Sequence, residues 1–279
     1  MNEKSFASLS ADFEGLFWAS TRGLPTEWMW GESPFDRQER IRGFDQKAVE
    51  KAFVWIFGVN GLGRTLAELL VRKGYARIGL CDPDEVELTN LHRTLWSHTA
   101  IGKMKVIQAL KELSEIAPSR SEILAYVGTL EEVIVVDAFL ENVSACLVGI
   151  DNDRGRAVAA KALRQKGIPA VFYSLSPDTY TYEVFVQDKD GPCWACLHPE
   201  RFLEGIQTFK PAQCPKVPSI ADTCFMAIGL CSYALDSLVM GRFREWNFRQ
   251  GHLHGQIPES IKEIGKRPDC PACGCGGKK

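Results

Sequence analysis

The sequence lacks a secretory leader, an apolar run long enough to span a bilayer, and a marked charge of either sign. Its 279 residues include 33 basic and 35 acidic side chains, for a formal net charge of −2. Such a balance gives no general attraction to nucleic acid, and we expect a cytoplasmic protein with no membrane segment. The five histidines form no spaced cluster with the cysteines, so no cysteine–histidine pair is predicted.

Cysteine, in contrast, is abundant, with ten residues. In a reducing compartment we expect metal ligands, small buried apolar residues or a nucleophile rather than a disulfide framework. Two CxxC pairs have the ligand spacing of a tetrahedral structural zinc site, and a redox pair or free thiols are the alternatives. Cys275 is a spare thiol beside the second pair. The predicted zinc ligands are Cys193, Cys196, Cys270 and Cys273.

An apolar run followed by glycines opens the main part of the chain. Residues 53–57 are predicted as a buried parallel strand, residues 58–63 as a tight turn and residues 64–73 as a helix. The next buried strand, residues 76–81, ends at Asp82. This order is typical of a nucleotide-binding βαβ unit, in which phosphate groups lie at the helix N-terminus.

The segment after the second strand carries more polar side chains than dinucleotide binding needs. Asp82 lies at the spacing of the acidic residue that binds ribose hydroxyls. Asp84, Asn90 and Arg93 follow closely, and Lys105 lies at the start of the next predicted helix. Two cations beside a helix N-terminus suit a triphosphate better than a neutral nicotinamide. We therefore predict ATP chemistry, with a nicotinamide enzyme as the weaker alternative.

Further strands complete the predicted sheet. Residues 122–127 and 145–150 are predicted as strands, and the second of these ends at Asp151 and Asn152. Since parallel strands present their carboxyl ends at one edge, these polar residues should meet in one pocket. Residues 179–186 alternate and predict an antiparallel edge strand. The predicted fold class is α/β, a Rossmann-like, doubly wound, mainly parallel sheet with an antiparallel edge and a structural zinc knuckle.

Three parts of the chain are distinguished. Residues 1–34 are rich in aromatic side chains and are predicted as an N-terminal arm that packs on the sheet, on a second subunit or on a protein partner. Residues 35–192 are predicted as the ATP-binding core, beginning with a helix over residues 36–50. Residues 193–279 are predicted as a zinc-bound crossover, a C-terminal helix and a tail that complete the same domain.

Six short motifs follow one another in a fixed order between residues 37 and 156. They are Arg37-Gln38, the glycine turn, Asp82-x-Asp84, Asn90-Leu-x-Arg93, Gly102-x-x-Lys105 and Asp151-Asn152-x-x-x-Arg156. This set resembles the adenylation domain of the ubiquitin-activating enzyme superfamily, and the similarity runs from about Phe35 to Cys273. The resemblance is strongest to its compact members, such as the molybdopterin-synthase and thiazole-biosynthesis adenylyltransferases and the small activating enzymes of ubiquitin-like modifiers.

The resemblance implies that the chain adenylates the C-terminal carboxylate of a ubiquitin-like protein, using ATP and magnesium and releasing pyrophosphate. Asp82 would hold the ribose, Arg93 and Lys105 the phosphate oxygens. Asn90 would orient the phosphate, and Asp151 would coordinate magnesium. By resemblance, the nucleotide-binding residues are Gly58, Gly61, Gly63, Asp82, Asp84, Asn90, Arg93, Lys105, Asp151 and Asn152.

Arg37 corresponds to a family arginine that reaches the phosphates from a neighbouring subunit. The resemblance therefore implies a homodimer with composite sites. Without it, an arginine before a helix is read as a surface residue.

A thioester step would need a nucleophilic cysteine. Cys224 lies at the predicted start of a helix, where the helix dipole should lower the pKa of its thiol. Its place resembles that of the nucleophile in small activating enzymes, which pass the modifier to a conjugating enzyme, and Cys214 is the competing candidate. The place of the cysteine in sulfur-carrier activators is occupied by Ile220. An adenylyltransferase for a sulfur carrier or small peptide, and a non-catalytic partner subunit, are the alternative functions.

Two residues of the glycine turn depart from the family pattern. Asn60 replaces a glycine and is expected to bring a side chain near the phosphates. Arg64 replaces a small residue, and either a phosphate contact or a surface position is expected for it.

Overall fold

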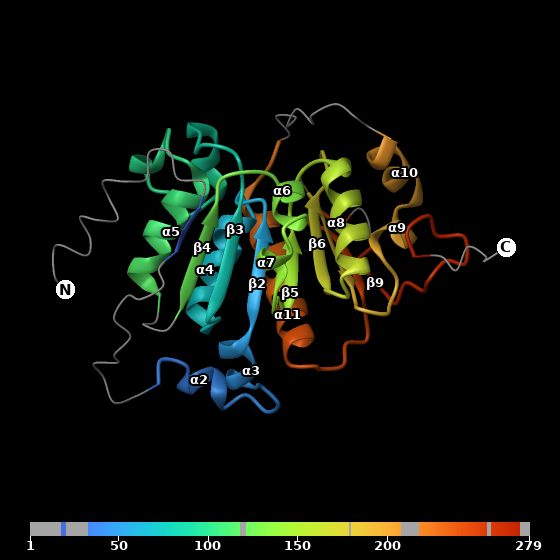
Figure 1. Ribbon diagram of the computed structural model, residues 1–279, viewed down its shortest axis with the longest axis horizontal. Helices are drawn as coiled ribbons and strands as arrows, with labels where there is room; N and C mark the ends of the chain where they lie inside the picture. Colours follow the sequence, from blue (N-terminus) through green and yellow to red (C-terminus); the bar gives the residue numbers. More distant parts are fainter. Residues whose placement is uncertain are drawn as a thin grey trace.

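Short apolar runs form the centre of a sheet with helices on both faces (Figure 1). The computed structural model describes residues 18–20, 33–117, 121–178, 180–207, 218–255 and 258–273. Within these residues, the strand order is β1-β4-β3-β2-β5-β6-β7-β8-β9. The strands are β1 (Trp18–Ser20), β2 (Phe53–Phe57), β3 (Arg77–Cys81), β4 (Glu122–Tyr126), β5 (Ala145–Val148), β6 (Ala170–Leu175), β7 (Thr181–Gln187), β8 (Phe248–His252) and β9 (Ser260–Lys262).

Five neighbouring strands, from β4 to β6 in the sheet, run parallel. Strands β7, β8 and β9 extend the sheet antiparallel on one side, and β1 pairs antiparallel with β4 on the other. The predicted mainly parallel sheet with an antiparallel edge is confirmed. The edge is wider than predicted, because β8 and β9 follow the predicted strand.

Strand β2 shows why the centre of the sheet is apolar throughout. Val54 and Ile56 point to one face, and Phe53, Trp55 and Phe57 point to the other. All five are buried, because helices cover both faces of a central parallel strand.

One face of the sheet is covered by α4, α5 and α11, and the other by α6, α7 and α8 (Figure 1). Loops between strands carry the remaining short helices. The helices are α2 (Asp36–Glu39), α3 (Gln46–Lys51), α4 (Gly63–Lys73), η1 (Leu88–Arg93), η2 (His98–Ala100), α5 (Lys105–Ile116), α6 (Leu130–Ile134), α7 (Asp137–Leu140), α8 (Asp153–Gln165), α9 (Trp194–Leu197), α10 (Pro199–Gln207) and α11 (Ala221–Val239).

No run long enough to span a bilayer was predicted, yet helix α11 passes that test by its length and apolar composition. More than half of it is buried against the rest of the fold, including β6, β7 and α4. This burial is what a helix in the core of a folded domain requires, and its apolar composition is accounted for in that way.

The N-terminal part of the chain differs from the prediction in one respect. The single helix predicted over residues 36–50 is wrong: α2 and α3 are separate, and Gly43 between them has a φ of +78°. That conformation lies in the left-handed region, which favours glycine and through which a right-handed helix cannot continue. Of the predicted arm, β1 lies on the sheet as an edge strand, and most of the rest lies outside the described residues.

Candidate functional site

The turn after β2 packs closely on the turn after β5. Gly58 has a φ of +93°, and its N–H donates to the carbonyl of Cys81 at 2.9 Å. A Cβ added to Gly58 would lie 2.9 Å from the carbonyl oxygen of Gly149, and one added to Gly63 would lie 1.8 Å from the carbonyl oxygen of Gly58. Both glycines are therefore needed, and the N-terminus of α4 faces the carboxyl edge of the sheet, where phosphate groups bind. Gly149 was not predicted, although a glycine at a strand end is a sequence indication of close backbone approach.

The Asn60 side chain forms hydrogen bonds with backbone groups of its own turn and of the turn after β5. Its Nδ2 donates to the carbonyl of Gly149 at 2.7 Å, and its Oδ1 accepts from Leu62 N at 3.2 Å and Gly63 N at 3.4 Å. Its φ is not positive, since Asn142 is the single non-glycine residue with positive φ in the described part of the chain. The side chain thus joins the two turns and accepts hydrogen bonds from backbone N–H groups at the start of α4.

Asp82 and Lys105 form a buried ion pair next to the glycine turn. Asp82 Oδ2 accepts from Val59 N at 2.7 Å, and its Oδ1 accepts from Asp84 N at 2.9 Å. Lys105 Nζ lies 3.5 Å from Asp82 Oδ1 and 2.8 Å from Asp84 Oδ2. The predicted cluster of one cation and two carboxylates is therefore assembled by the ends of β3 and α5.

Burial and pairing act against each other on these groups. Burial raises the pKa of Asp82, although Lys105 and two backbone N–H groups favour its carboxylate. Burial would lower the pKa of Lys105, but the charges of Asp82 and Asp84 outweigh it and raise that pKa. Lys105 is therefore a permanent cation at neutral pH.

Helix η1 places Arg93 against the glycine turn. A Cβ on Gly61 would lie 3.1 Å from Arg93 Nε, and Arg93 Nη1 donates to the carbonyl of Thr89 at 2.6 Å. Asn90 Oδ1 accepts from Glu87 N at 3.0 Å, which caps η1. The structure thus brings Arg93 to the turn, whereas the side-chain oxygen of Asn90 is used within η1.

The turn after β5 carries the predicted magnesium ligand. Asp151 is exposed at the carboxyl edge of the sheet, two residues after Gly149. Asn152 Oδ1 accepts from Gly155 N at 2.7 Å and caps α8, and Arg156 Nε donates to the carbonyl of Ile150 at 2.8 Å. Asn152 therefore stabilises the turn, and Asp151 lies on the edge that also holds the glycine turn.

Arg64 is buried, which contradicts both expectations for it. Its side chain is 2% exposed, and its guanidinium pairs with Glu68 at 3.2 Å and Glu112 at 2.8 Å. It also lies 5.0 Å from the ring centroid of Trp96. Arg64 therefore bridges α4 and α5 and is neither a phosphate ligand nor a surface residue.

Arg37 is exposed on α2, at the opposite end of α4 from the glycine turn (Figure 1). Its neighbour Gln38 donates from Nε2 to the carbonyl of Lys73, at the C-terminus of α4, at 2.8 Å. Helix α4 has 11 residues, so its two ends are about 16 Å apart. Within one chain, the structure does not bring Arg37 to the site.

Cys224 lies in the first turn of α11, but the prediction of a lowered thiol pKa is wrong. Its side chain is fully buried between α11 and the sheet. Burial raises the pKa of the thiol to about 11, against an opposing effect of the Arg93 charge. The cost of burying a charged thiolate thus decides the direction of this pKa shift. The competing candidate, Cys214, lies outside the described residues.

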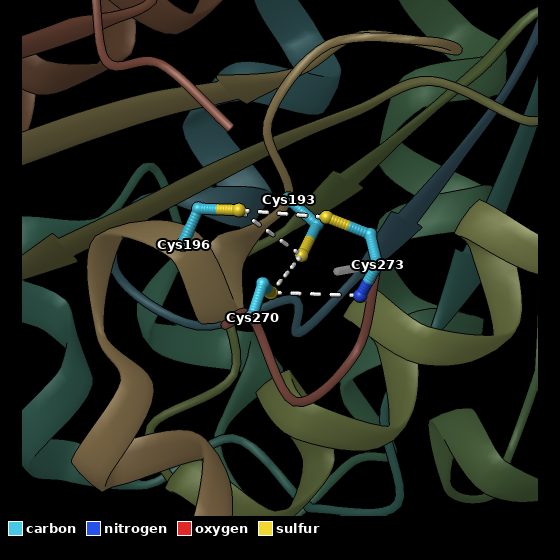
Figure 2. A group of neighbouring side chains, drawn as sticks. All are labelled: Cys193, Cys196, Cys270 and Cys273. Carbon is cyan, nitrogen blue, oxygen red and sulfur yellow. Dashed lines mark hydrogen bonds between the residues drawn. The ribbon is translucent and has the colours of Figure 1, made fainter. Parts of the chain in front are cut away.

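The four predicted zinc ligands converge from two distant parts of the chain (Figure 2). The Sγ atoms of Cys193 and Cys270 are 3.5 Å apart, and those of Cys196 and Cys273 are 3.4 Å apart. The Sγ atoms of Cys193 and Cys196 are 3.9 Å apart, and all four lie within 4.8 Å of one another. A tetrahedral zinc ion with sulfur at about 2.3 Å separates its ligands by about 3.8 Å, so the cluster fits this metal.

Four thiolates would fill the coordination sphere of such an ion and leave no open position, so a zinc ion held here would be structural. Burial raises the pKa of Cys270, but the backbone N–H groups of Cys273 and Ala272 lower it, to about 7 overall. The spare thiol, Cys275, lies outside the described residues. The cluster therefore fastens the segment leaving β9 to the segment leaving β7.

Comparisons with known proteins agree with these motifs. The ThiF family matches residues 35–271. The adenylyltransferase and sulfurtransferase UBA4 of Kluyveromyces lactis is 26% identical over 257 residues, which are 86% of this chain and 54% of that protein. The sulfur carrier protein adenylyltransferase of Thermus thermophilus is 26% identical over 266 residues, which are 88% of this chain and 93% of that protein. The chain thus spans about half the length of the first relative and most of the second.

Solved structures show the same fold. The crystal structure of E. coli MccB with ATP superposes with a TM-score of 0.70 at 17% identity, over 87% of this chain and 75% of that chain. The family match covers most of the sequence and includes every predicted nucleotide-binding residue. The chain therefore belongs to the ThiF family.

Proposed function

We infer that this chain adenylates the C-terminal carboxylate of a ubiquitin-like or sulfur carrier protein, with ATP as the second substrate. The observation that carries this proposal is the position of Lys105. Its ammonium pairs with Asp82 and Asp84, and Asp82 in turn accepts a hydrogen bond from the glycine turn. Arg93 lies against the same turn. Two cations and a helix N-terminus at one place form a site for a triphosphate, and the relatives named above include adenylyltransferases.

The proposed reaction joins a substrate carboxylate oxygen to the α-phosphorus of ATP, while the bond to pyrophosphate breaks and pyrophosphate leaves with its electron pair. The nucleophile is already an anion, so no general base is needed. Lys105 and Arg93 would reduce the repulsion between the anions, and Asp82 retains lone pairs for ribose hydroxyls. Magnesium at Asp151, when bound, would neutralise phosphate charge.

Pyrophosphate release with Mg-ATP and a carrier protein tests this proposal. We expect release from wild type and an acyl adenylate on the carrier C-terminus, detected by intact-mass analysis. A carrier without its terminal glycine should give no release. No release with a panel of ubiquitin-like and sulfur carrier proteins would contradict the proposal.

Thioester transfer to Cys224, and from there to a conjugating enzyme, is a second candidate. One observation favours it: the positive charge of Arg93 acts to lower the pKa of the Cys224 thiol. Because the thiol is buried with a pKa of about 11, we expect Cys224→Ala to keep pyrophosphate release within about twofold of wild type. Intact-mass analysis without reductant checks for an adduct, and Cys231→Ala, which alters a second buried thiol of α11, is the matched control. A thiol-sensitive adduct on wild type that is lost only in Cys224→Ala would establish the thioester route.

The remote position of Arg37 supports a homodimer in which this residue acts on the neighbouring site. Mixed expression of Arg37→Ala and Lys105→Ala chains tests it, since each variant alone should be inactive. A mixed dimer contains one site with both residues intact, so random assortment should restore about a quarter of the wild-type activity. If Arg37 acts within its own chain, mixing will restore nothing, and if it takes no part in the reaction, Arg37→Ala alone will be active.

A further inference from the structure

The first turn of α8, directly after Asp151, is held from outside by α10. Arg201 forms a two-point ion pair with Asp153, with Nε 3.0 Å from Oδ2 and Nη2 2.7 Å from Oδ1. Gly205, one turn further along α10, lies so close that a Cβ there would be 2.5 Å from the carbonyl oxygen of Asp153. Helix α10 is therefore seated on the residues that follow the predicted magnesium ligand.

Arg201 also packs on Trp194, which lies within the first CxxC pair of the cysteine cluster. Its guanidinium lies 5.4 Å from the ring centroid of Trp194, which stands between Cys193 and Cys196 in the sequence. Trp194 is 1% exposed and stacks on Phe172 of β6 at 6.1 Å. The arginine thus packs on a buried ring of α9, which lies between two cysteines of the cluster.

We propose that Arg201 is a positioning residue that holds the Asp151 turn in place, with the cysteine cluster as its anchor. This inference rests on the proposed function, in which Asp151 binds magnesium. Arg201 acts through Asp153, with which it forms the ion pair. The planar guanidinium suits this task, because two parallel hydrogen bonds fix the direction of the carboxylate as well as its distance.

Arg164 provides a matched control at the other end of α8. Its Nη1 donates to the carbonyl of Lys189 at 2.5 Å, and its Nη2 donates to the carbonyl of Gly191, in the segment that leads into the cysteine cluster. Arg164 therefore connects the same helix to the same part of the chain, but far from Asp151. A general loosening of α8 should follow from either substitution, whereas the proposed effect should follow from only one.

Hydrogen exchange of the zinc-loaded protein is the first test, because it needs no activity. Arg201→Gln should speed exchange of the amides of residues 151–156 by about tenfold, and Arg164→Gln should leave them unchanged. Arg201→Lys should give an intermediate value, since an ammonium keeps the charge but loses the two-point contact. Equal exchange in Arg201→Gln and wild type, or the same change in both glutamine variants, would overturn the proposal.

Magnesium titration of pyrophosphate release is the second test. Arg201→Gln should raise the half-saturating magnesium concentration by about tenfold, as residues that orient metal ligands typically do. The KM for ATP at saturating magnesium should change less than twofold, and Arg164→Gln should match wild type in both. An unchanged magnesium requirement would overturn the proposal. If wild type itself releases no pyrophosphate, the proposed function fails, and the exchange experiment alone decides the role of Arg201.

Discussion

Lys105→Ala is expected to lower the rate of pyrophosphate release by about 10²- to 10³-fold, the cost of losing one preorganised charge at a developing anion. The same substitution leaves two carboxylates without their cation, one of them, Asp82, buried. Breaking a buried pair from one side costs about 3 kcal/mol or more. The variant should therefore lose both activity and free energy of unfolding.

These two losses can be separated. Lys105→Met with Asp84→Asn removes one cation and one anion, so the charge balance beside Asp82 is partly restored. We expect it to recover part of the stability of Lys105→Ala in urea unfolding but none of its activity. Lys103→Ala is the control, because Lys103 is exposed and lies two residues from Lys105 in the sequence. This variant should match wild type in both measurements. Recovery of activity in the double variant would show that Lys105 has a structural role only.

The pH dependence of stability follows from the raised pKa of Lys105. A lysine whose folded pKa exceeds its unfolded value stabilises the fold fully below the unfolded pKa. That contribution is lost only as the pH rises through the folded pKa. Since the ordinary pKa of lysine is about 10.4, the ion pair should be intact throughout the neutral range. The stability difference between wild type and Lys105→Ala should therefore be constant between about pH 7 and pH 9 and should shrink only at higher pH.

Local patterns in the sequence predicted the elements that carry the proposed nucleotide site. The apolar run before Gly58 and the spacing from that turn to Asp82 depend on neighbouring residues alone, and both predictions are confirmed in the fold. The cysteine pairs were equally readable, because each CxxC is a local ligand unit. That the two CxxC units share one site could be predicted as well, because a structural zinc ion takes four ligands.

Contacts between distant segments were not predictable in the same way. Arg64 pairs with Glu112, 48 residues away, and this turns an expected surface arginine into a buried one. Asn60 reaches the carbonyl of Gly149, 89 residues away, for which no spacing rule exists. The burial of Cys224 depends on which face of α11 lies on the sheet, and α11 is apolar enough to leave that face undetermined from sequence.

Removal of the cysteine cluster's metal is expected to have the largest effect on stability. Cys270→Ser should lower the zinc content from one ion per chain to near zero. The cluster joins residues 77 positions apart, and apart from it the segment around Cys270 and Cys273 has few buried side chains. Loss of a structural metal belongs to the substitutions that cost about 4 kcal/mol or more, which corresponds to a fall in Tm of about 10 °C for a domain of this size.

Metal analysis of purified protein and thermal unfolding check this result. Cys275→Ser is the matched control, because it alters the neighbouring thiol and should keep both the zinc and the Tm of wild type. If Cys275→Ser loses the metal instead, the fourth ligand is the spare thiol. A Cys270→Ser protein that keeps its Tm without zinc would contradict the structural assignment. The ion should stabilise the fold because it closes a long loop at one buried point, and the same closure fixes α9, from which α10 and Arg201 extend to the Asp151 turn.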